Sequence, residues 1–520
     1  MNSKKSTSTS VLGLIIFCFL LSRMYRLTAL PIFIDEGIHI RYASDVWQGR
    51  FLEGLYHGKL LQILLTSLVV PWAPDPLWMS RFVTVIIGIL AVWACYGIGR
   101  RLYDERVGLF SAGLYIICPF TLFYDRMALA DGILSTFGAL TLLWSISMLQ
   151  ERKKRDVLLL GLAMALGILT KVLGLFLLLT PCLASLLCLR EKKSYPWRHL
   201  AGAYSIALGI AAVPLYIFFR ETTQISEKSL ITDAPFEFLR LLVSNAEMAR
   251  EWLWIYWTPT LLVLGVSGLL IGIVRKKRCN ILLAILAFLP ILVLGVVSRM
   301  WFPRYFLFTT IPFLVLASWS LCQLTKAIEF WRNTKRGERQ YVKVHKLVTL
   351  AFFLVMGLPS FIIDYHLWKD PSGAGLPKIE RIQYIEEWPS GYGVAETARF
   401  LGQEVARHPT ETFVVRHEMS DGTYYGLDVY MMKEPRIRLK LLNMHYPGSF
   451  LQLQAWAEGH PTFVVLTQPP LAKAKGDQPD IKRLLSVATL ERSYPKPGGR
   501  RTVEVYRVQA GSYREKGRER

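Results

Sequence analysis

Two adjacent carboxylates are the first residues in this chain that could do chemistry. Asp35 and Glu36 lie in FIDEGIHIRYA at residues 33–43, just beyond an apolar run that begins at Val11. A carboxylate within about 3 Å of a hydroxyl group can orient it and take its proton. The same pair could instead stabilise the positive N-terminal end of a helix, by roughly 0.3–1 kcal/mol. Taken alone, these two residues leave both interpretations open.

Six further polar residues stand at the ends of apolar runs. They are Lys59 in LYHGKLLQ, Arg126 and Asp131 in YDRMALAD, Lys171 in LTKV, and Arg304 and Tyr305 in SRMWFPRY. A basic side chain at the end of a membrane span commonly extends to lipid head groups, so none is informative singly. Together, cations can neutralise the charge that grows on a departing phosphate, while a carboxylate accepts the proton of an attacking hydroxyl. The set therefore suits displacement at the anomeric carbon of a sugar, with a lipid phosphate leaving.

Apolar segments must position these residues. Hydrophobic residues make up 52% of the 520 residues and charged residues only 19%. Apolar runs that suit membrane spans recur through the first 363 residues, which is typical of a polytopic membrane protein. We expect the apolar stretch at 59–72 and the segment at 237–257 to form helices along the membrane surface. We predict eleven transmembrane helices, at 11–29, 80–99, 107–123, 133–149, 157–170, 173–189, 200–219, 257–274, 280–298, 305–324 and 346–363.

The charge distribution indicates topology and not nucleic-acid binding. Of the net charge of +22, residues 377–520 contribute only a surplus of five, with 22 Lys and Arg against 17 Asp and Glu. The other positive charges gather in alternate connections between spans, such as ERKKRD at 151–156 and RKKR at 275–278. Basic connections of this kind stay in the cytoplasm. We therefore predict a cytoplasmic N-terminus, with the loops at 30–79 and 220–256 and all the candidate residues on the outer side.

The pattern changes to that of a soluble domain in the C-terminal part. GVAETARFLGQEVARHP reads as a helix, and TETFVVRHE, PTFVVLTQ and RTVEVYRV read as strands. KPGG before the last strand predicts a hairpin turn. The predicted fold is a mainly α-helical membrane module at residues 1–363, followed by a small α/β domain at residues 364–520 outside the membrane.

The motifs around the candidate residues resemble a known group of enzymes. FIDEGIHIRYA, YDRMALADGILSTFGAL, GILTKVLGLFLLLTP and PRYFLFTTIPF, with a loop lysine before an apolar helix, look like the polytopic GT-C glycosyltransferases. Within that group the chain is most similar to the protein O-mannosyltransferase-like enzymes (glycosyltransferase family 39) and the lipid A aminoarabinose transferases. The resemblance covers roughly residues 10–325.

The resemblance implies an inverting transfer of a sugar from a polyprenyl-phosphate donor to an acceptor on a lipid, a glycan or a protein. It implies that Asp35 acts as the general base or as the carboxylate that positions the acceptor, with Glu36 as its partner. Lys59 and Arg304 would bind the lipid phosphate, and Lys171 would assist them. The reaction would take place on the periplasmic or lumenal side of the membrane.

Three further residues receive broader roles from the same resemblance. Arg126 and Asp131 would hold the loops in place or contact substrate, and Tyr305 would belong to the substrate site beside the neighbouring arginine. The loop at 220–256 is far too short for the inserted lumenal domain of eukaryotic O-mannosyltransferases. We therefore expect a bacterial inner membrane protein, with undecaprenyl phosphate as the lipid carrier.

Some features depart from the relatives or leave alternatives open. Leu60 follows Lys59, whereas a proline tends to follow the loop lysine in the aminoarabinose transferases. No metal cofactor is predicted, although a divalent cation stays an alternative, with Asp35, Glu36, His39 and His57 as its candidate ligands. A transporter or flippase for a lipid-linked sugar and an inactive scaffold subunit are the competing functions. A transporter would place ionisable residues near the bilayer midplane and show two similar halves, and this sequence shows neither.

Overall fold

The computed structural model describes residues 2–510, except 53–56, 189–193, 226–234, 334–340, 419–422, 444–447 and 469–478. The contacts divide the chain into two compact units. The first unit comprises Met1–Leu27, Asp45–Leu68 and Ser80–Pro377. The second comprises Thr28–Ser44, Val69–Met79 and Lys378–Arg520.

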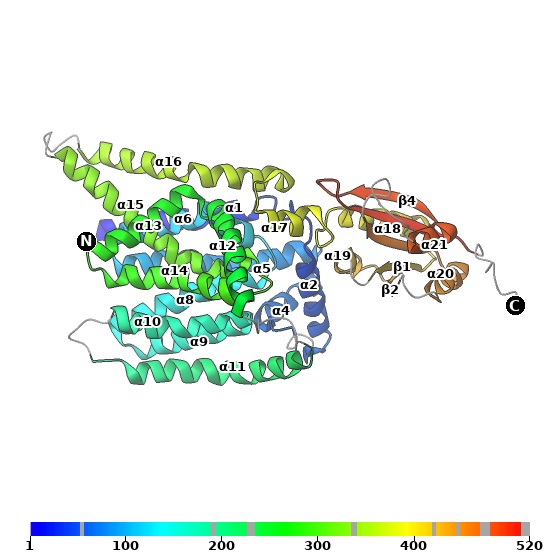
Figure 1. Ribbon diagram of the computed structural model, residues 1–520, viewed down its shortest axis with the longest axis horizontal. Coiled ribbons are helices and arrows are strands. Elements are labelled where there is room, and N and C mark those ends of the chain that lie inside the picture. Colours follow the sequence, from blue (N-terminus) through cyan, green and yellow to red (C-terminus); the bar gives the residue numbers. More distant parts are fainter. Residues whose placement is uncertain are drawn as a thin grey trace. The chain divides into compact units, whose positions relative to one another are not determined.

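The first unit is built almost entirely of helices, many of which run side by side in Figure 1. Its α-helices are α1 (Asn2–Met24), α4 (Leu60–Ser67), α5 (Pro76–Leu102), α6 (Glu105–Ile117), α7 (Pro119–Asp125), α8 (Ala130–Glu151), α9 (Lys154–Thr170), α10 (Leu179–Cys188), α11 (Trp197–Ile225), α12 (Pro235–Tyr256), α13 (Thr258–Val274), α14 (Arg278–Val297), α15 (Thr310–Asn333) and α16 (Tyr341–Lys369). Three short 3₁₀ segments join them, namely η2 (Val172–Leu178), η3 (Pro303–Thr309) and η5 (Pro371–Gly373).

Each predicted span coincides with helical structure, but the predicted count of eleven is not confirmed. Among the described residues, five helical stretches are long and apolar enough to cross a membrane: α5, α8, α11, α14 and the η3–α15 stretch. Two bent pairs, α6–α7 and α12–α13, would raise the number to seven. The helix predicted at 59–72 is present as α4 followed by a 3₁₀ turn, η1 (Val70–Trp72).

Breaks between helices occur where the backbone cannot continue a regular helix. α6 and α7 meet at 63° around Cys118, directly before Pro119, whose ring and missing N–H interrupt helical hydrogen bonding. α12 and α13 meet at 104°, at Thr258, where φ is +52°. This angle suits the predicted orientation of α12 along the membrane surface.

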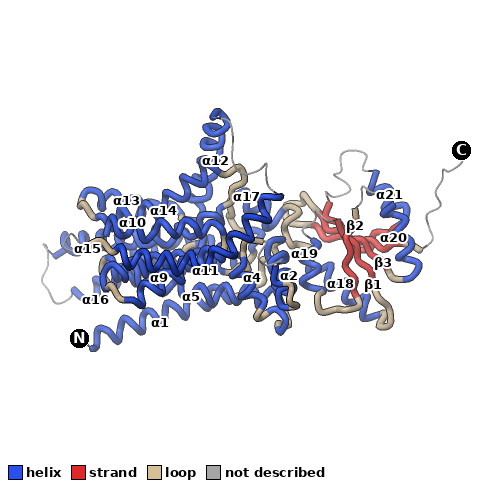
Figure 2. The backbone as a smooth tube through the Cα atoms, turned by 90° about the horizontal axis from the view of Figure 1, so that it is seen from below, coloured by secondary structure: helices blue, strands red, loops and turns tan. Residues whose placement is uncertain are grey.

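The second unit contains a five-stranded sheet, drawn in red in Figure 2. Its strand order is β2-β1-β3-β5-β4, with β1 parallel to β2 and β3, and β5 antiparallel to β3 and β4. The three predicted strands and the predicted helix are confirmed, whereas β2 and β4 were not predicted. The strands are β1 (Phe413–Glu418), β2 (Ile437–Leu442), β3 (Thr462–Gln468), β4 (Ala488–Pro495) and β5 (Thr502–Val508). The helices are α2 (Ile34–Trp47), α17 (Lys378–Arg381), a π-helical turn η6 (Ile382–Glu386), α18 (Val394–Arg407), α19 (Thr423–Met431), α20 (Gly448–Gly459) and α21 (Pro479–Val487).

Each face of the sheet has its own apolar core. On one face Val415 and Phe463 pack with residues of α18 and α19. On the other face Val464 and Tyr506 pack with residues of α20 and α21. The alternation of side chains along β3 produces this division, because neighbouring strand residues point to opposite faces. The unit is therefore a three-layer α/β structure.

The helix that carries the paired carboxylates belongs to this second unit. Ile32 and Ile40 are buried in the core that α18 and α19 form with the sheet, and Val70 and Leu77 join the same core. The predicted membrane module at residues 1–363 includes the whole stretch 30–79. The contacts instead group residues 28–44 and 69–79 with the C-terminal residues.

Candidate active site

An ion pair joins two of the predicted site residues in the first unit. Lys171 lies between α9 and η2, and its Nζ is 2.7 Å from Oδ1 of Asp131 in the first turn of α8. The lysine and aspartate side chains are only 14% and 4% exposed, so water hardly screens the pair. α8 packs along α9. This packing brings together two residues that lie 40 positions apart in the chain.

Two aromatic rings lie against the basic groups of Lys171 and Arg304. The Nζ of Lys171 lies 4.4 Å from the centroid of the Tyr305 ring. The guanidinium carbon of Arg304 lies 4.7 Å from the Phe302 ring and 5.8 Å from the Tyr305 ring. The face of an aromatic ring attracts a cation without neutralising its charge. The rings can thus orient both cations without neutralising their charges.

Lys59 directly follows Gly58, a glycine that no other residue could replace without strain. Gly58 has a φ of +67°, and a Cβ there would lie 2.5 Å from a ring carbon of Phe218. Lys59 then directly precedes α4. α4 packs against α9, the helix that ends beside Lys171.

Electrostatics links Lys59 to the other cations. Burial and the charges of Lys59 and Arg304 lower the pKa of Lys171 to about 8, against the opposing effect of Asp131. The structure therefore brings five of the predicted site residues together, and we call them the cation cluster: Lys59, Asp131, Lys171, Arg304 and Tyr305. With three basic groups and one carboxylate, the cluster has a formal charge of +2 when Lys171 is protonated.

Arg126 has a different environment. Its guanidinium group donates hydrogen bonds to the backbone carbonyl oxygens of Tyr25 at 2.9 Å and Arg26 at 2.8 Å, just beyond the end of α1. Its residue exposure is 8%. These contacts support the predicted role of Arg126 in holding the loops in place.

Sequence reasoning missed the buried charges next to it. Arg23 Nε lies 3.4 Å from Oδ2 of Asp125, and Tyr115 donates a 3.0 Å hydrogen bond to Oδ1 of the same carboxylate. The sequence predicts no role for Asp125. Its position at the end of an apolar run gave no signal that a basic partner from α1 would lie beside it.

The paired carboxylates differ from each other in their surroundings. Oε2 of Glu36 accepts a 3.0 Å hydrogen bond from the backbone N–H of Phe33, which caps the first turn of α2. Glu36 is fully buried. Asp35, also in the first turn, is only partly buried. Glu36 thus has a structural contact of its own, and Asp35 is the more accessible of the two.

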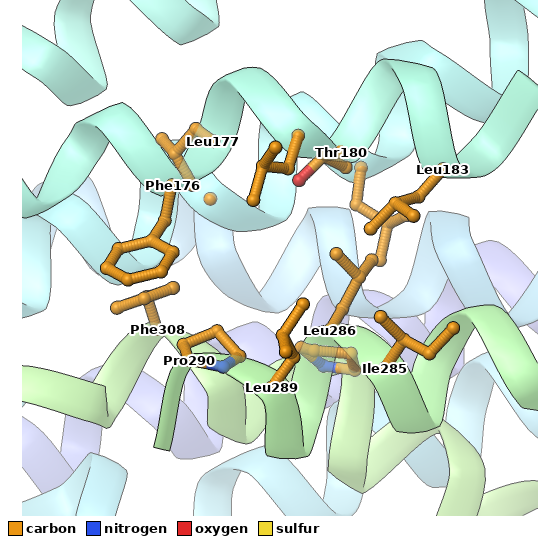
Figure 3. A pocket seen from close by; sticks show the side chains of 13 residues that line it. Phe176, Leu177, Thr180, Leu183, Ile285, Leu286, Leu289, Pro290 and Phe308 are labelled. Carbon is orange, nitrogen blue, oxygen red and sulfur yellow. The ribbon is translucent and has the colours of Figure 1, made fainter. Parts of the chain in front are cut away.

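An apolar groove that the sequence did not reveal lies in the first unit. In Figure 3, Leu177, Thr180 and Leu183 face Ile285, Leu286 and Leu289 across the opening. The two sides come from η2–α10 and from α14. The lining of the groove is almost wholly apolar.

The groove and the cation cluster share two segments of the chain. η2 starts one residue after Lys171, and its Phe176 lines the groove. η3 carries Arg304 and Tyr305, and its Phe308 lines the groove from the other side. The rings of Phe176 and Phe308 have centroids 6.1 Å apart at one end of the opening (Figure 3). A charged cluster and an apolar groove are therefore built on the same two short segments.

The described part of the chain has no group of three or more His, Cys, Asp or Glu side chains that could hold a metal ion. The expectation that the site works without a metal stays a prediction.

Comparisons with known proteins bear on the fold and the family. Residues 61–217 match the profile of the dolichyl-phosphate-mannose-protein mannosyltransferase family. No curated protein matches the chain significantly. The residues 61–217 that match the family profile include the loop after α4, the Arg126–Asp131 turn and Lys171.

Solved structures match over nearly the whole chain. ArnT from Cupriavidus metallidurans in the apo state has a TM-score of 0.57 at 15% identity, with 97% of this chain and 98% of that chain covered. The same protein bound to undecaprenyl phosphate has a TM-score of 0.55 at 14% identity, with 96% of this chain and 97% of that chain covered. A third match is the oligosaccharyltransferase AglB from Archaeoglobus fulgidus, in complex with an inhibitory peptide and a dolichol-phosphate. Its TM-score is 0.55 at 13% identity, with 99% of this chain and 75% of that chain covered. The predicted resemblance is confirmed at the level of the fold, and this integral membrane chain has the architecture of the GT-C glycosyltransferases.

Proposed function

We propose that the protein is a glycosyltransferase that moves a sugar from a polyprenyl-phosphate donor to an acceptor hydroxyl group, with inversion at the anomeric carbon. The acceptor would be a lipid, a glycan or a protein. The basic connections predict that the reaction takes place on the extracytoplasmic face, in a bacterial inner membrane.

The observation that carries this proposal is the cation cluster next to the apolar groove. A lipid phosphate combines an anionic head with a long apolar chain, and the two features of the first unit match these two parts. The phosphate monoester that leaves carries up to two negative charges. The cluster's formal charge of +2 matches that charge as it develops, which is the kind of stabilisation that lowers such a barrier most.

Asp35 is the residue that we assign as general base. The acceptor oxygen forms a bond to the anomeric carbon as the bond from that carbon to the phosphate oxygen breaks. The acceptor proton passes to the Asp35 carboxylate, and the electron pair of the broken bond leaves with the lipid phosphate. A single displacement of this kind inverts the anomeric configuration. Glu36 would keep the first turn of α2 in place through its hydrogen bond to Phe33.

The relatives support a lipid-phosphate donor in general terms. ArnT has been solved with undecaprenyl phosphate and AglB with a dolichol-phosphate. The choice of sugar and of acceptor has no such support, so the first experiment must scan donors.

The test is turnover of labelled polyprenyl-phosphate sugars by the purified protein in lipid, with Asp35→Asn and Lys171→Met as paired variants. We expect one donor to be transferred or hydrolysed, and we expect Asp35→Asn to lose turnover while it still binds donor. Lys171→Met should weaken both. The same assay in EDTA tests the metal-free prediction, and activity that returns only with a divalent cation would contradict it.

Two outcomes would count against the enzyme. If Asp35→Asn keeps full turnover, another residue is the base. If the protein binds a donor but moves it intact across the bilayer of a proteoliposome, the transporter alternative is correct.

A further inference from the structure

The helix that carries Asp35 is held by the C-terminal α/β unit. Ile34 N–H donates a 3.2 Å hydrogen bond to the carbonyl oxygen of Pro389, and Ile40 is fully buried in the core between helices and sheet. A Cβ on Gly391 would lie 2.0 Å from the carbonyl oxygen of Ile32. The backbone before and within α2 therefore fits closely against this unit.

One face of α2 contacts α19. A Cβ on Gly37 would lie 2.8 Å from the Cβ of Tyr425 and 2.9 Å from its carbonyl oxygen. Gly37 and Arg41 are four residues apart, so they lie on the same face of the helix. Arg41 Nη1 lies 2.6 Å from Oδ2 of Asp428 and donates a 2.6 Å hydrogen bond to the hydroxyl oxygen of Tyr424. Gly37 thus permits the close approach of α2 to α19, and Arg41 connects the two helices through its ion pair and hydrogen bond.

The helix on the other side of this contact, α19, packs against the sheet. The Tyr424 ring stacks on the imidazole of His417 in β1, with centroids 4.1 Å apart and ring planes at 23°. The guanidinium carbon of Arg41 lies 5.5 Å from the centroid of the same tyrosine ring. Tyr424 and Asp428 are themselves four residues apart on α19, so both present their polar groups to one arginine. We call Arg41, Tyr424 and Asp428 the α2–α19 latch.

The latch is poorly suited to a stabilising role. The Arg41 and Asp428 side chains are 38% and 21% exposed. Ion pairs with this much access to water contribute little to folding. Two buried apolar residues that precede Arg41, Ile32 and Ile40, already hold the segment in the core. What the ion pair adds is a defined position of α2 along α19.

We propose that Arg41 and Asp428 are positioning residues for Asp35, and that the C-terminal unit serves to hold the helix that carries the base. This inference rests on the proposed function, because it needs Asp35 to act in the reaction. A displacement of about 1 Å at a catalytic group can cost roughly 10²-fold in rate. Loss of the latch should therefore lower kcat, while the donor, which is bound by the cation cluster, should keep its affinity.

The experiment compares Arg41→Ala, Asp428→Ala and the exchanged pair Arg41→Asp/Asp428→Arg in the full-length protein. We expect each single variant to lose 10- to 100-fold in kcat with unchanged donor KM, and we expect the exchanged pair to recover at least tenfold over either single variant. Arg399→Ala is the matched control, because Arg399 pairs with Glu396 on the surface of the same unit. Amide hydrogen exchange should be faster in α2 of the single variants and unchanged in α18.

The outcomes separate this inference from the proposed function. Unchanged kcat in Arg41→Ala, with Asp35→Asn inactive, would overturn the latch and leave the enzyme intact. A raised acceptor KM at unchanged kcat would overturn it as well, because the unit would then act in acceptor selection. Full activity of Asp35→Asn would instead refute the role of Asp35, and with it the reason for positioning α2.

Discussion

Lys171 is the residue of the cation cluster whose charge should respond to pH. Its pKa is lowered to about 8 by burial and by Lys59 and Arg304, so the ammonium group is present below this pH and lost above it. Because kcat/KM reports the free enzyme, we expect kcat/KM for the donor to fall as the pH rises through about 8. In Lys171→Arg the fall should disappear from this range, since a guanidinium stays protonated. A wild-type profile that stays flat to pH 9.5 would show that another cation binds the phosphate.

Arg126 should contribute to stability and not to the chemical step. Arg126→Ala removes two hydrogen bonds to the carbonyl oxygens of Tyr25 and Arg26. An unsatisfied buried acceptor costs about 1–3 kcal/mol, so we expect a lower melting temperature in detergent. The kcat of the remaining folded protein should stay within about threefold of wild type, less than 1 kcal/mol in the barrier. An unchanged melting temperature with lost turnover would mean that Arg126 contacts substrate.

At the scale of the elements, the groove between α10 and α14 makes a prediction about the lipid chain. Leu183→Trp adds a large side chain to the lining and should occlude the groove. We expect donor KM to rise about tenfold for a long polyprenyl phosphate, which corresponds to 1.4 kcal/mol. A donor with a ten-carbon prenyl chain should be affected much less, because it does not need the length of the groove.

Leu186→Trp is the control for this prediction. Leu186 lies on the same helix, is 64% exposed and does not line the groove. Equal effects of the two tryptophans, or equal effects on long and short donors, would show that the groove does not hold the lipid.

The elements also show where sequence patterns stop being informative. Apolar runs located all the predicted helices, because burial in lipid demands long hydrophobic segments. They did not locate the break at Cys118, although Pro119 marks it, because this break lies inside a continuous apolar run where hydropathy alone has no feature. The 104° turn at Thr258, in contrast, coincides with the predicted boundary between the surface helix at 237–257 and the span at 257–274. The groove was hidden for the same reason as the break at Cys118, since Leu183 and Leu286 look like any lipid-facing leucines.

At the scale of the whole molecule, the organisation into units could not be read along the chain. Gly37 and Arg41 carry no local sign that their contacts are Tyr425 and Asp428, hundreds of residues later. The cation cluster could be predicted because its members all stand at the ends of apolar runs on one predicted side. The assignment of 28–44 to the C-terminal unit depends on tertiary packing, which single-sequence patterns do not encode.

The topology of the whole chain can be tested with two introduced cysteines. The alternating basic connections predict that the C-terminal unit is outside and that the RKKR connection at 275–278 is inside. Ser486 is exposed at the end of α21, and Lys277 is exposed between α13 and α14. In intact spheroplasts we expect a membrane-impermeant maleimide to label Ser486→Cys and to leave Lys277→Cys unlabelled. After permeabilisation both should react.

The parent for this experiment needs the native thiols replaced, which the distribution of cysteines makes feasible. All seven cysteines lie between residues 18 and 322, and none lies in the C-terminal unit. A seven-serine parent that retains donor turnover is the background, and the parent itself should remain unlabelled. Labelling of Lys277→Cys in intact spheroplasts, with Ser486→Cys protected, would show that the topology is the inverse of the predicted one. The cation cluster would then face the cytoplasm, which would contradict the proposed extracytoplasmic reaction.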